Sequence, residues 1–121
     1  MTGLQPEQPL IEAVHHYAHP LRNGVSAMPG AAIALAELHA RGVRIGLISN
    51  TIWPGDLHRE DLIAVGLWSY IEYAVFSGDS GIWKPHPQIF LRVLEHFGVS
   101  PTEAIFVGDN PREDIRGAQQ A

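Results

Sequence analysis

Three groups of residues have the types and spacing that phosphate and metal chemistry requires. Asp109 and Asp114, in the sequence GDNPRED, are carboxylates that can approach one point when the following helix folds back, and paired carboxylates suit Mg²⁺. Ser49 and Asn50 open the turn SNT, whose hydroxyl, amide and backbone donors suit a phosphate oxygen. Lys84, the only lysine in the chain, lies in IWKPHP and suits a fixed positive charge aimed at a phosphoryl group.

Each group also has an ordinary explanation. Acidic residues are common in the first turn of any helix, the SNT sequence is typical of Asx and Ser/Thr turns, and a lysine usually lies on the surface. The three groups together are more specific, because their combination can hold phosphate and Mg²⁺ side by side. This combination predicts a site for phosphoryl-transfer chemistry at one edge of the fold.

The elements that position these groups follow from hydrophobic periodicity. Short apolar runs predict β-strands at residues 43–48, 71–76 and 104–107. Helices are predicted at residues 10–18, 31–41, 57–65, 89–97 and from Asn110 onward. The apolar residues of the helix at 89–97 form one stripe that Gly98 ends, and Asn110 is expected to cap the last helix. Strands that alternate with helices indicate an α/β fold with a parallel sheet. Ligands of such sheets bind beyond the carboxyl ends of the strands, where all three groups are expected.

Composition argues against several classes of function. The 121 residues allow one domain, and a net charge of −5 argues against nonspecific binding to nucleic acid or to an anionic membrane. The chain has no cysteine, which excludes disulfides and thiolate sites. No apolar run approaches the ~20 residues of a membrane span, so a cytoplasmic protein is expected. His15, His16 and His19 could suggest a metal site, but a solvated or partner-facing helix is the favoured interpretation.

Residues 28–121 resemble the haloacid dehalogenase-like (HAD) hydrolases. VRIGLISNT is similar to the family's second motif, GIWKPHPQIF to its lysine-bearing third motif and AIFVGDNPREDIRGAQQA to its metal-binding fourth motif. The resemblance implies a Rossmann-like three-layer α/β sandwich with a parallel sheet, and Mg²⁺-dependent hydrolysis of a small phosphorylated metabolite. It implies roles for five residues: phosphate binding by Ser49, Asn50 and Lys84, charge stabilisation in catalysis by Lys84, and metal binding by Asp109 and Asp114.

One motif of the family is absent. The family's first motif, D-x-D-x-[TV], supplies a nucleophilic aspartate that forms an aspartyl-phosphate, whereas the first aspartate of this chain is Asp56. Asp56, Asp61 and Asp79 are candidates for that role only by default, and Asp79 could instead tune Lys84 or cap the loop. The resemblance places the strand of the first motif between the strands at residues 43–48 and 104–107. The chain is therefore expected to carry an incomplete fold whose nucleophile lies outside it, and to be inactive alone.

The resemblance also divides the chain in two. Residues 1–27 are expected to be the remnant of a helical cap or linker, and residues 28–121 a partial core domain. A complementary chain that supplies the missing strand is one expected partner. Two alternatives stay open: a noncatalytic fragment or split-subunit binding module of the same fold, and a haloacid dehalogenase, which needs no metal. The acidic pair Asp109 and Asp114 favours the phosphatase over the dehalogenase.

Overall fold

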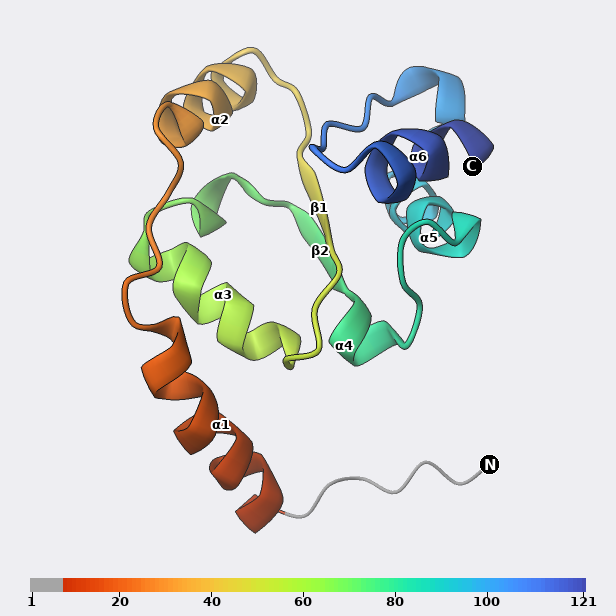
Figure 1. Ribbon diagram of the computed structural model, residues 1–121. Helices are drawn as coiled ribbons and strands as arrows, with labels where there is room; N and C mark the ends of the chain where they lie inside the picture. Colours follow the sequence, from red (N-terminus) through yellow and green to blue (C-terminus); the bar gives the residue numbers. More distant parts are fainter. Residues whose placement is uncertain (1–7) are drawn as a thin grey trace.

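The computed structural model describes residues 8–121 (Figure 1). Its helices and strands are, in chain order, α1 (Gln8–Arg22), α2 (Ala31–Ala40), β1 (Gly46–Ser49), α3 (Gly55–Ala64), β2 (Tyr73–Phe76), α4 (Ser77–Ser80), α5 (Pro87–Phe97) and α6 (Gly117–Gln120). Short helical turns lie at Trp68–Tyr70, Pro101–Glu103 and Pro111–Arg116, and the last of these runs directly into α6. Within residues 8–121, no helix is long and apolar enough to cross a membrane.

Strands β1 and β2 pair in parallel along their whole length. The strands predicted at residues 43–48 and 71–76 are thus confirmed as parallel, but both begin later than predicted. One cause of the late start of β1 is the end of α2, where the backbone N–H of Val43 still donates to the carbonyl of Leu38 at 3.0 Å. A backbone group that closes a helix is not available to a sheet, so the first residues of the apolar run serve as a helix cap.

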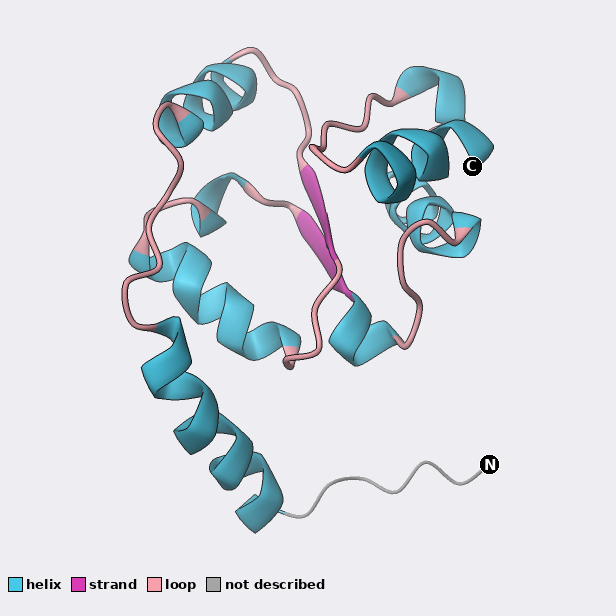
Figure 2. Ribbon diagram, in the orientation of Figure 1, coloured by secondary structure: helices cyan, strands magenta, loops and turns pink. Residues whose placement is uncertain are grey.

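The prediction of a third strand at residues 104–107 is wrong. This segment is drawn as loop in Figure 2, and it pairs with neither strand of the described chain. Its side chains nevertheless alternate as in a strand. The ring of Phe106 meets that of Phe90 in α5 edge to face, with the centroids 5.0 Å apart, whereas Ile105 and Val107 are 92% and 87% exposed. The apolar pattern of a strand is therefore present, but within residues 8–121 its outer face lacks a cover and its backbone lacks a neighbour.

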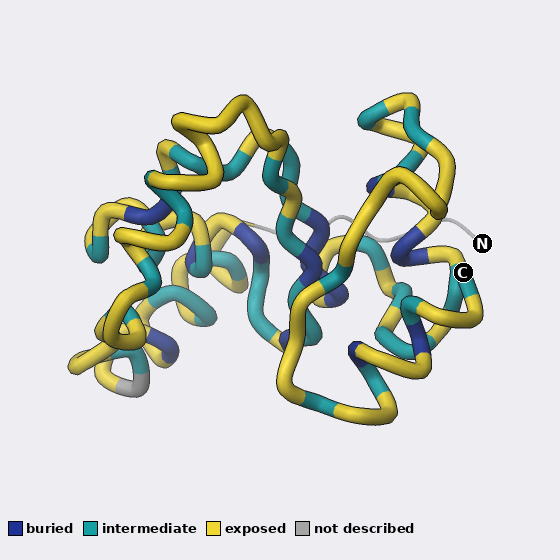
Figure 3. The backbone as a smooth tube through the Cα atoms, turned by 90° about the horizontal axis from the view of Figure 1, so that it is seen from above, coloured by how far each residue is buried: buried dark blue, intermediate teal, exposed yellow. Residues whose placement is uncertain are grey.

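The core lies between the sheet and α5, and Figure 3 shows buried residues along the paired strands. It is built from apolar side chains of the two strands and of α5: Ile48, Val75, Ile89, Phe90 and Val93. The predicted apolar stripe of this helix is confirmed. The helix ends at Gly98, whose φ of 66° lies in the left-handed region that glycine adopts without strain.

Helices flank the sheet on both sides. In Figure 1, α2 and α3 lie on one side of the strands and α5 and α6 on the other, which confirms the predicted α/β class with its parallel sheet and its layers. Helix α2 is apolar, yet none of its residues is buried, and Ile33 is 74% exposed. Helix α1 runs to Arg22, beyond its predicted end, and polar contacts of His15 and Arg22 join it to α3. The division of the chain at residue 27 stays a prediction, and residues 1–7 of that segment lie outside the described part.

Candidate active site

Asn50 connects two of the predicted site loops directly. Its Nδ2 donates to the carbonyl of Lys84 at 3.0 Å, and its Oδ1 accepts the backbone N–H of Lys84 at 2.8 Å. Asn50 follows β1, and Lys84 lies between α4 and α5, so one side-chain amide fixes the second loop on the first. The Asn50 amide uses one of its two Nδ2 hydrogens on Lys84, so its second hydrogen and the hydroxyl of Ser49 are the side-chain donors that these two residues can offer to a phosphate.

The side chain of Lys84 reaches the carboxylate of Asp114. Nζ of Lys84 lies 2.6 Å from Oδ1 of Asp114, and the two side chains are only 11% and 6% exposed. The ammonium also lies over the ring of Phe106, 5.4 Å from the centroid. The lysine predicted to face phosphate and one of the carboxylates predicted to face a metal are therefore each other's partners in this structure.

Several contacts favour the ionised form of Asp114. Burial by itself raises the pKa of this carboxyl, but the hydrogen bonds from Lys84 and from the backbone N–H of Asn110, together with the charge of Lys84, hold the pKa below its ordinary value of 3.8. The Asn110 N–H donates to Oδ2 at 3.0 Å. As predicted, Asn110 also caps the following helix, since its Oδ1 accepts the N–H groups of Arg112 and Glu113.

Asp109 lies beside this buried pair but is itself exposed. The loop passes directly against Asp114, because a Cβ built on Gly108 would lie 2.3 Å from the Asp114 Cγ. Asp109 in the loop and Asp114 in the helical turn after it supply the hard oxygen ligands that Mg²⁺ prefers. Among residues 8–121, no three His, Cys, Asp or Glu side chains gather into a candidate metal cluster. The donors therefore fit Mg²⁺ in type, and the remaining ligands would be water, substrate phosphate or groups outside this part of the chain.

The turn after β1 is held by Ser77, a residue outside the three predicted groups. Ser77 begins α4 and is 1% exposed, and its Oγ accepts the N–H of Thr51 at 2.7 Å and donates to the Thr51 carbonyl at 2.9 Å. Next to it, a Cβ on Gly78 would lie 2.2 Å from the carbonyl oxygen of Trp53, so α4 is tightly packed against the same loop. The sequence signal that could have identified Ser77 is its place directly after the second strand.

The three aspartates considered as default nucleophiles are engaged at α3. Oδ2 of Asp56 lies 3.1 Å from Nε2 of His15 in α1. Asp61 binds Arg22 at the end of α1.

Oδ1 of Asp79 accepts the N–H of Gly55 at 3.0 Å, at the start of α3. Of the two roles open to Asp79 from the sequence, tuning Lys84 or capping a loop, the structure supports the second.

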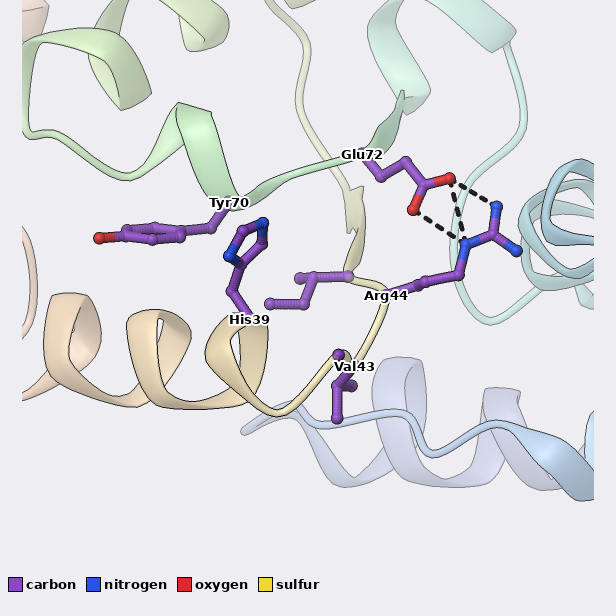
Figure 4. Close-up of a pocket in the computed structure, with 7 residues that line it drawn as sticks. His39, Val43, Arg44, Tyr70 and Glu72 are labelled. Atoms are coloured by element: carbon purple, nitrogen blue, oxygen red, sulfur yellow. Dashed lines mark hydrogen bonds and ion pairs between the residues drawn. The ribbon is translucent and has the colours of Figure 1, made fainter.

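A cavity of about 260 Å³ lies at the other end of the sheet (Figure 4). Its walls include His39 at the end of α2 and Tyr70, whose rings meet edge to face with centroids 5.8 Å apart. Arg44 and Glu72, which precede the two strands, form an ion pair at the same place. Because these residues lie at the amino ends of the strands, the cavity is remote from the loops that carry the candidate site.

Comparisons with known proteins agree with this arrangement. A family model described as haloacid dehalogenase-like hydrolase matches residues 4–121. A phosphoserine phosphatase of Thermus thermophilus is 44% identical over 93 residues, which make up 77% of this chain and 36% of the phosphatase.

Solved structures share the fold as well. A HAD phosphatase from Thermococcus onnurineus is 31% identical with a TM-score of 0.72, over 91% of this chain and 48% of that one. A 2-haloacid dehalogenase from Pseudomonas syringae pv. tomato is 32% identical with a TM-score of 0.75, over 94% of this chain and 46% of that one. The chain thus spans less than half of the length of each of these three proteins.

Proposed function

This chain belongs to the haloacid dehalogenase-like hydrolase family, and on that premise we propose that it forms the phosphate-binding part of a cytoplasmic phosphomonoester hydrolase. The observation that carries the proposal is the junction of three loops: Asn50 binds the backbone of Lys84, and the Lys84 side chain binds Asp114. These loops follow the carboxyl ends of both strands and of the segment 104–107, where open parallel sheets bind ligands. The phosphoserine phosphatase relative supports a small phosphorylated metabolite as the substrate.

The residues of this junction divide the work of holding a phosphoryl group. Ser49 donates its hydroxyl to a phosphate oxygen, and the amide of Asn50 keeps the Lys84 loop against the turn. The ammonium of Lys84 has three hydrogens and gives one of them to Asp114, so two remain for phosphate oxygens. Because Asp114 also orients the lysine, the positive charge stands in place before the substrate arrives, which strengthens its effect on the transition state.

Asp109 and Asp114 are the residues that hold Mg²⁺ in this proposal. A bound ion supplies positive charge that neutralises the transferring phosphoryl group. Asp109 is exposed and free to meet the ion directly. The oxygens of Asp114 each accept one hydrogen bond, from Lys84 and from Asn110, and each keeps a second lone pair.

The carboxylate nucleophile, which carries the phosphoryl group as an aspartyl-phosphate, lies outside residues 1–121 in this proposal. Its strand belongs beside β1, which pairs only with β2 among the described residues. The exposed Ile105 and Val107 support the same gap, since they are the uncovered face of a segment with strand-like alternation. Further polypeptide or a complementary chain fills this gap.

Dehalogenation is the second candidate, favoured by the likeness to the Pseudomonas syringae enzyme. The two functions differ in their need for metal and in the bond that is broken. The acidic pair Asp109 and Asp114 supports the phosphatase, because a reaction without metal gives no role to the exposed carboxylate of Asp109 beside the buried one of Asp114.

Hydrolysis of an aryl phosphate tests the proposal. Residues 1–121 alone are expected to show negligible turnover, whereas a form extended by the upstream reading frame gains Mg²⁺-dependent activity. In that longer form, Asp109→Asn and Lys84→Met each lower the rate by about 100-fold or more. Metal-independent chloride release from 2-chloropropionate, without phosphate release, would establish the dehalogenase instead. Robust aryl phosphate turnover by residues 1–121 that survives Asp109→Asn would overturn both the metal site and the missing nucleophile.

A further inference from the structure

A cluster of polar contacts links helix α1 to the turn after β1, and the proposed chemistry gives it no role. His58 of α3 lies at its centre. Nε2 of His58 is 2.5 Å from Oγ1 of Thr51, and the imidazole stacks on the ring of Phe76 with centroids 5.6 Å and planes 19° apart. Thr51 is only 9% exposed and directly follows Ser49 and Asn50, so His58 contacts the one turn residue that faces the interior.

A neutral ring at His58 satisfies the hydrogen bonds of the cluster. The backbone N–H of Trp53 donates to Oγ1 of Thr51 at 3.1 Å, which leaves the hydroxyl its own hydrogen to donate. In the neutral tautomer with its proton on Nδ1, Nε2 of His58 accepts that hydrogen, and Nδ1 faces Oδ2 of Asp61 at 3.8 Å. A doubly protonated ring would present a hydrogen at Nε2 too, and the hydroxyl would lose its acceptor.

Asp61 continues the connection to α1. Nε and Nη2 of Arg22, near the end of α1, donate to Oδ1 of Asp61 at 3.0 and 2.7 Å, and Nη2 also donates to the carbonyl of Leu57 at 2.7 Å. The Arg22 and Asp61 side chains are 16% and 17% exposed, so the pair is largely shielded from water. A second contact joins Tyr17 of α1 to Trp53, with ring centroids 6.3 Å apart. Helix α1 therefore reaches Thr51 by two routes, through His58 and through Trp53.

We propose that His58 is a positioning residue, which as a neutral imidazole holds Thr51, and with it the turn at Ser49 and Asn50, in the conformation that binds phosphate while α1 is docked on α3. This role rests on the proposed phosphate site. Ser77 already restrains the backbone of Thr51, and His58 restrains its hydroxyl. With both restraints in place, the turn does not have to be ordered when phosphate binds, which favours binding.

The surroundings of the ring support its neutral state. Burial lowers the pKa of His58 below its ordinary value of 6.5. The charged groups that face the ring act in both directions: Asp61 and Asp79 raise the pKa, and Arg22 lowers it. Burial outweighs the two carboxylates, so the ring is uncharged at neutral pH and takes up a proton only in acid.

Two substitutions at His58 separate hydrogen bonding from packing. His58→Gln keeps an acceptor oxygen near the position of Nε2, whereas His58→Leu fills the space without an acceptor. Orthophosphate is titrated into residues 1–121 at a pH where the ring is neutral, and the amide NMR signals of Ser49 and Asn50 report binding. The phosphate Kd is expected to rise about 5-fold or more in His58→Leu and to stay within about 2-fold of the unchanged chain in His58→Gln. His16→Leu, at an exposed position of α1, is the matched control and is expected to leave Kd unchanged.

A second measurement needs no phosphate. The amide signals of Thr51 and Trp53 are followed as the pH is lowered, and they are expected to share an inflection below pH 6.5, where the ring becomes charged. In His58→Gln this inflection should vanish, because glutamine does not titrate. Signal dispersion in each spectrum reports whether a variant is folded. If His58→Leu does not fold, Thr51→Val takes its place.

The outcomes distinguish this proposal from the proposed function. An equal rise of Kd in His58→Gln and His58→Leu would show that the ring only fills space, which overturns the positioning role. An inflection that persists in His58→Gln would assign it to another group and overturn the role as well. Orthophosphate that shifts no signal near Ser49 refutes the phosphate site and hence any role of His58 in binding. In that case the pH titration of the Thr51 and Trp53 amide signals still decides whether His58 restrains Thr51.

Discussion

The side-chain amide of Asn50 binds both backbone polar groups of Lys84, its N–H at 2.8 Å and its carbonyl at 3.0 Å. The residues are 34 positions apart in the sequence, and this pair of hydrogen bonds holds the turn after β1 against the loop before α5. Asn50 thus organises the candidate site by fixing where Lys84 stands. The ammonium of Lys84 then completes the site by its contact with Asp114.

Asn50→Ala is expected to destabilise the chain by about 1–3 kcal/mol, because it leaves two partly buried backbone groups of Lys84 without partners. Asn50→Asp is expected to destabilise it as well, since a carboxylate accepts from the Lys84 N–H but repels the Lys84 carbonyl. Urea unfolding measures both changes. Gln119→Ala, at an exposed position of α6, is the control, and a loss in Asn50→Ala no larger than in this control would contradict the bridging role.

The ion pair of Lys84 and Asp114 makes a separate prediction. Removing one partner leaves a largely buried charge without compensation, so Lys84→Met and Asp114→Leu are each expected to cost roughly 3–5 kcal/mol in unfolding free energy. The double variant removes both charges and should be more stable than the sum of the single losses predicts. Strictly additive losses in this double-mutant cycle would show that the two side chains do not interact.

The stability of the chain should depend on pH through Asp114. The pKa of this carboxyl is lower in the folded chain than its ordinary value of 3.8, so its ionised form stabilises the fold at every pH above that value. The contribution is lost as the pH falls through the folded-state pKa, where the carboxylate takes up a proton. Unfolding free energies of the unchanged chain and of Asp114→Asn should therefore converge as the pH is lowered from about 6 to about 2.5. A constant difference over this range would contradict the assignment.

Gly108→Ala should disrupt the site although Gly108 is exposed. A Cβ at this position would lie 2.3 Å from Cγ of Asp114, so the carboxylate or the loop has to move and the contact with Lys84 is lost. The expected result is a destabilisation of about 2 kcal/mol or more and a shifted NMR environment for Lys84. Val107→Ala is the neighbouring control, because that side chain is 87% exposed. Equal stability of the two variants would refute the close approach.

Substitutions on the two faces of the segment 104–107 test whether its outer face is uncovered. Phe106→Ala removes a ring that packs on Phe90 and is expected to cost about 3 kcal/mol. Ile105→Thr changes a side chain that is 92% exposed and is expected to alter the unfolding free energy of residues 1–121 by less than about 0.5 kcal/mol. A large loss from Ile105→Thr would mean that this face is covered in residues 1–121.

Local patterns were sufficient for the elements whose ends and faces depend on nearby residues. The stripe of α5 and its end at Gly98 follow from the helical period and from the left-handed backbone that glycine tolerates. Asn110 can be recognised as a cap from the sequence because its side chain binds N–H groups only two and three residues away. Site residues could be named for a similar reason: in a parallel sheet, the ends of strands determine where ligands bind.

Tertiary structure decided which of these residues meet and how. No local signal shows that Lys84 pairs with Asp114, or that Ser77 and His58 restrain Thr51, because these pairs come from elements that only folding brings together. The segment 104–107 shows the same limit from the other side. The sequence of this segment has the apolar alternation of a strand, but a strand forms only where a neighbouring backbone accepts and donates hydrogen bonds. Within residues 8–121, no strand pairs with this segment.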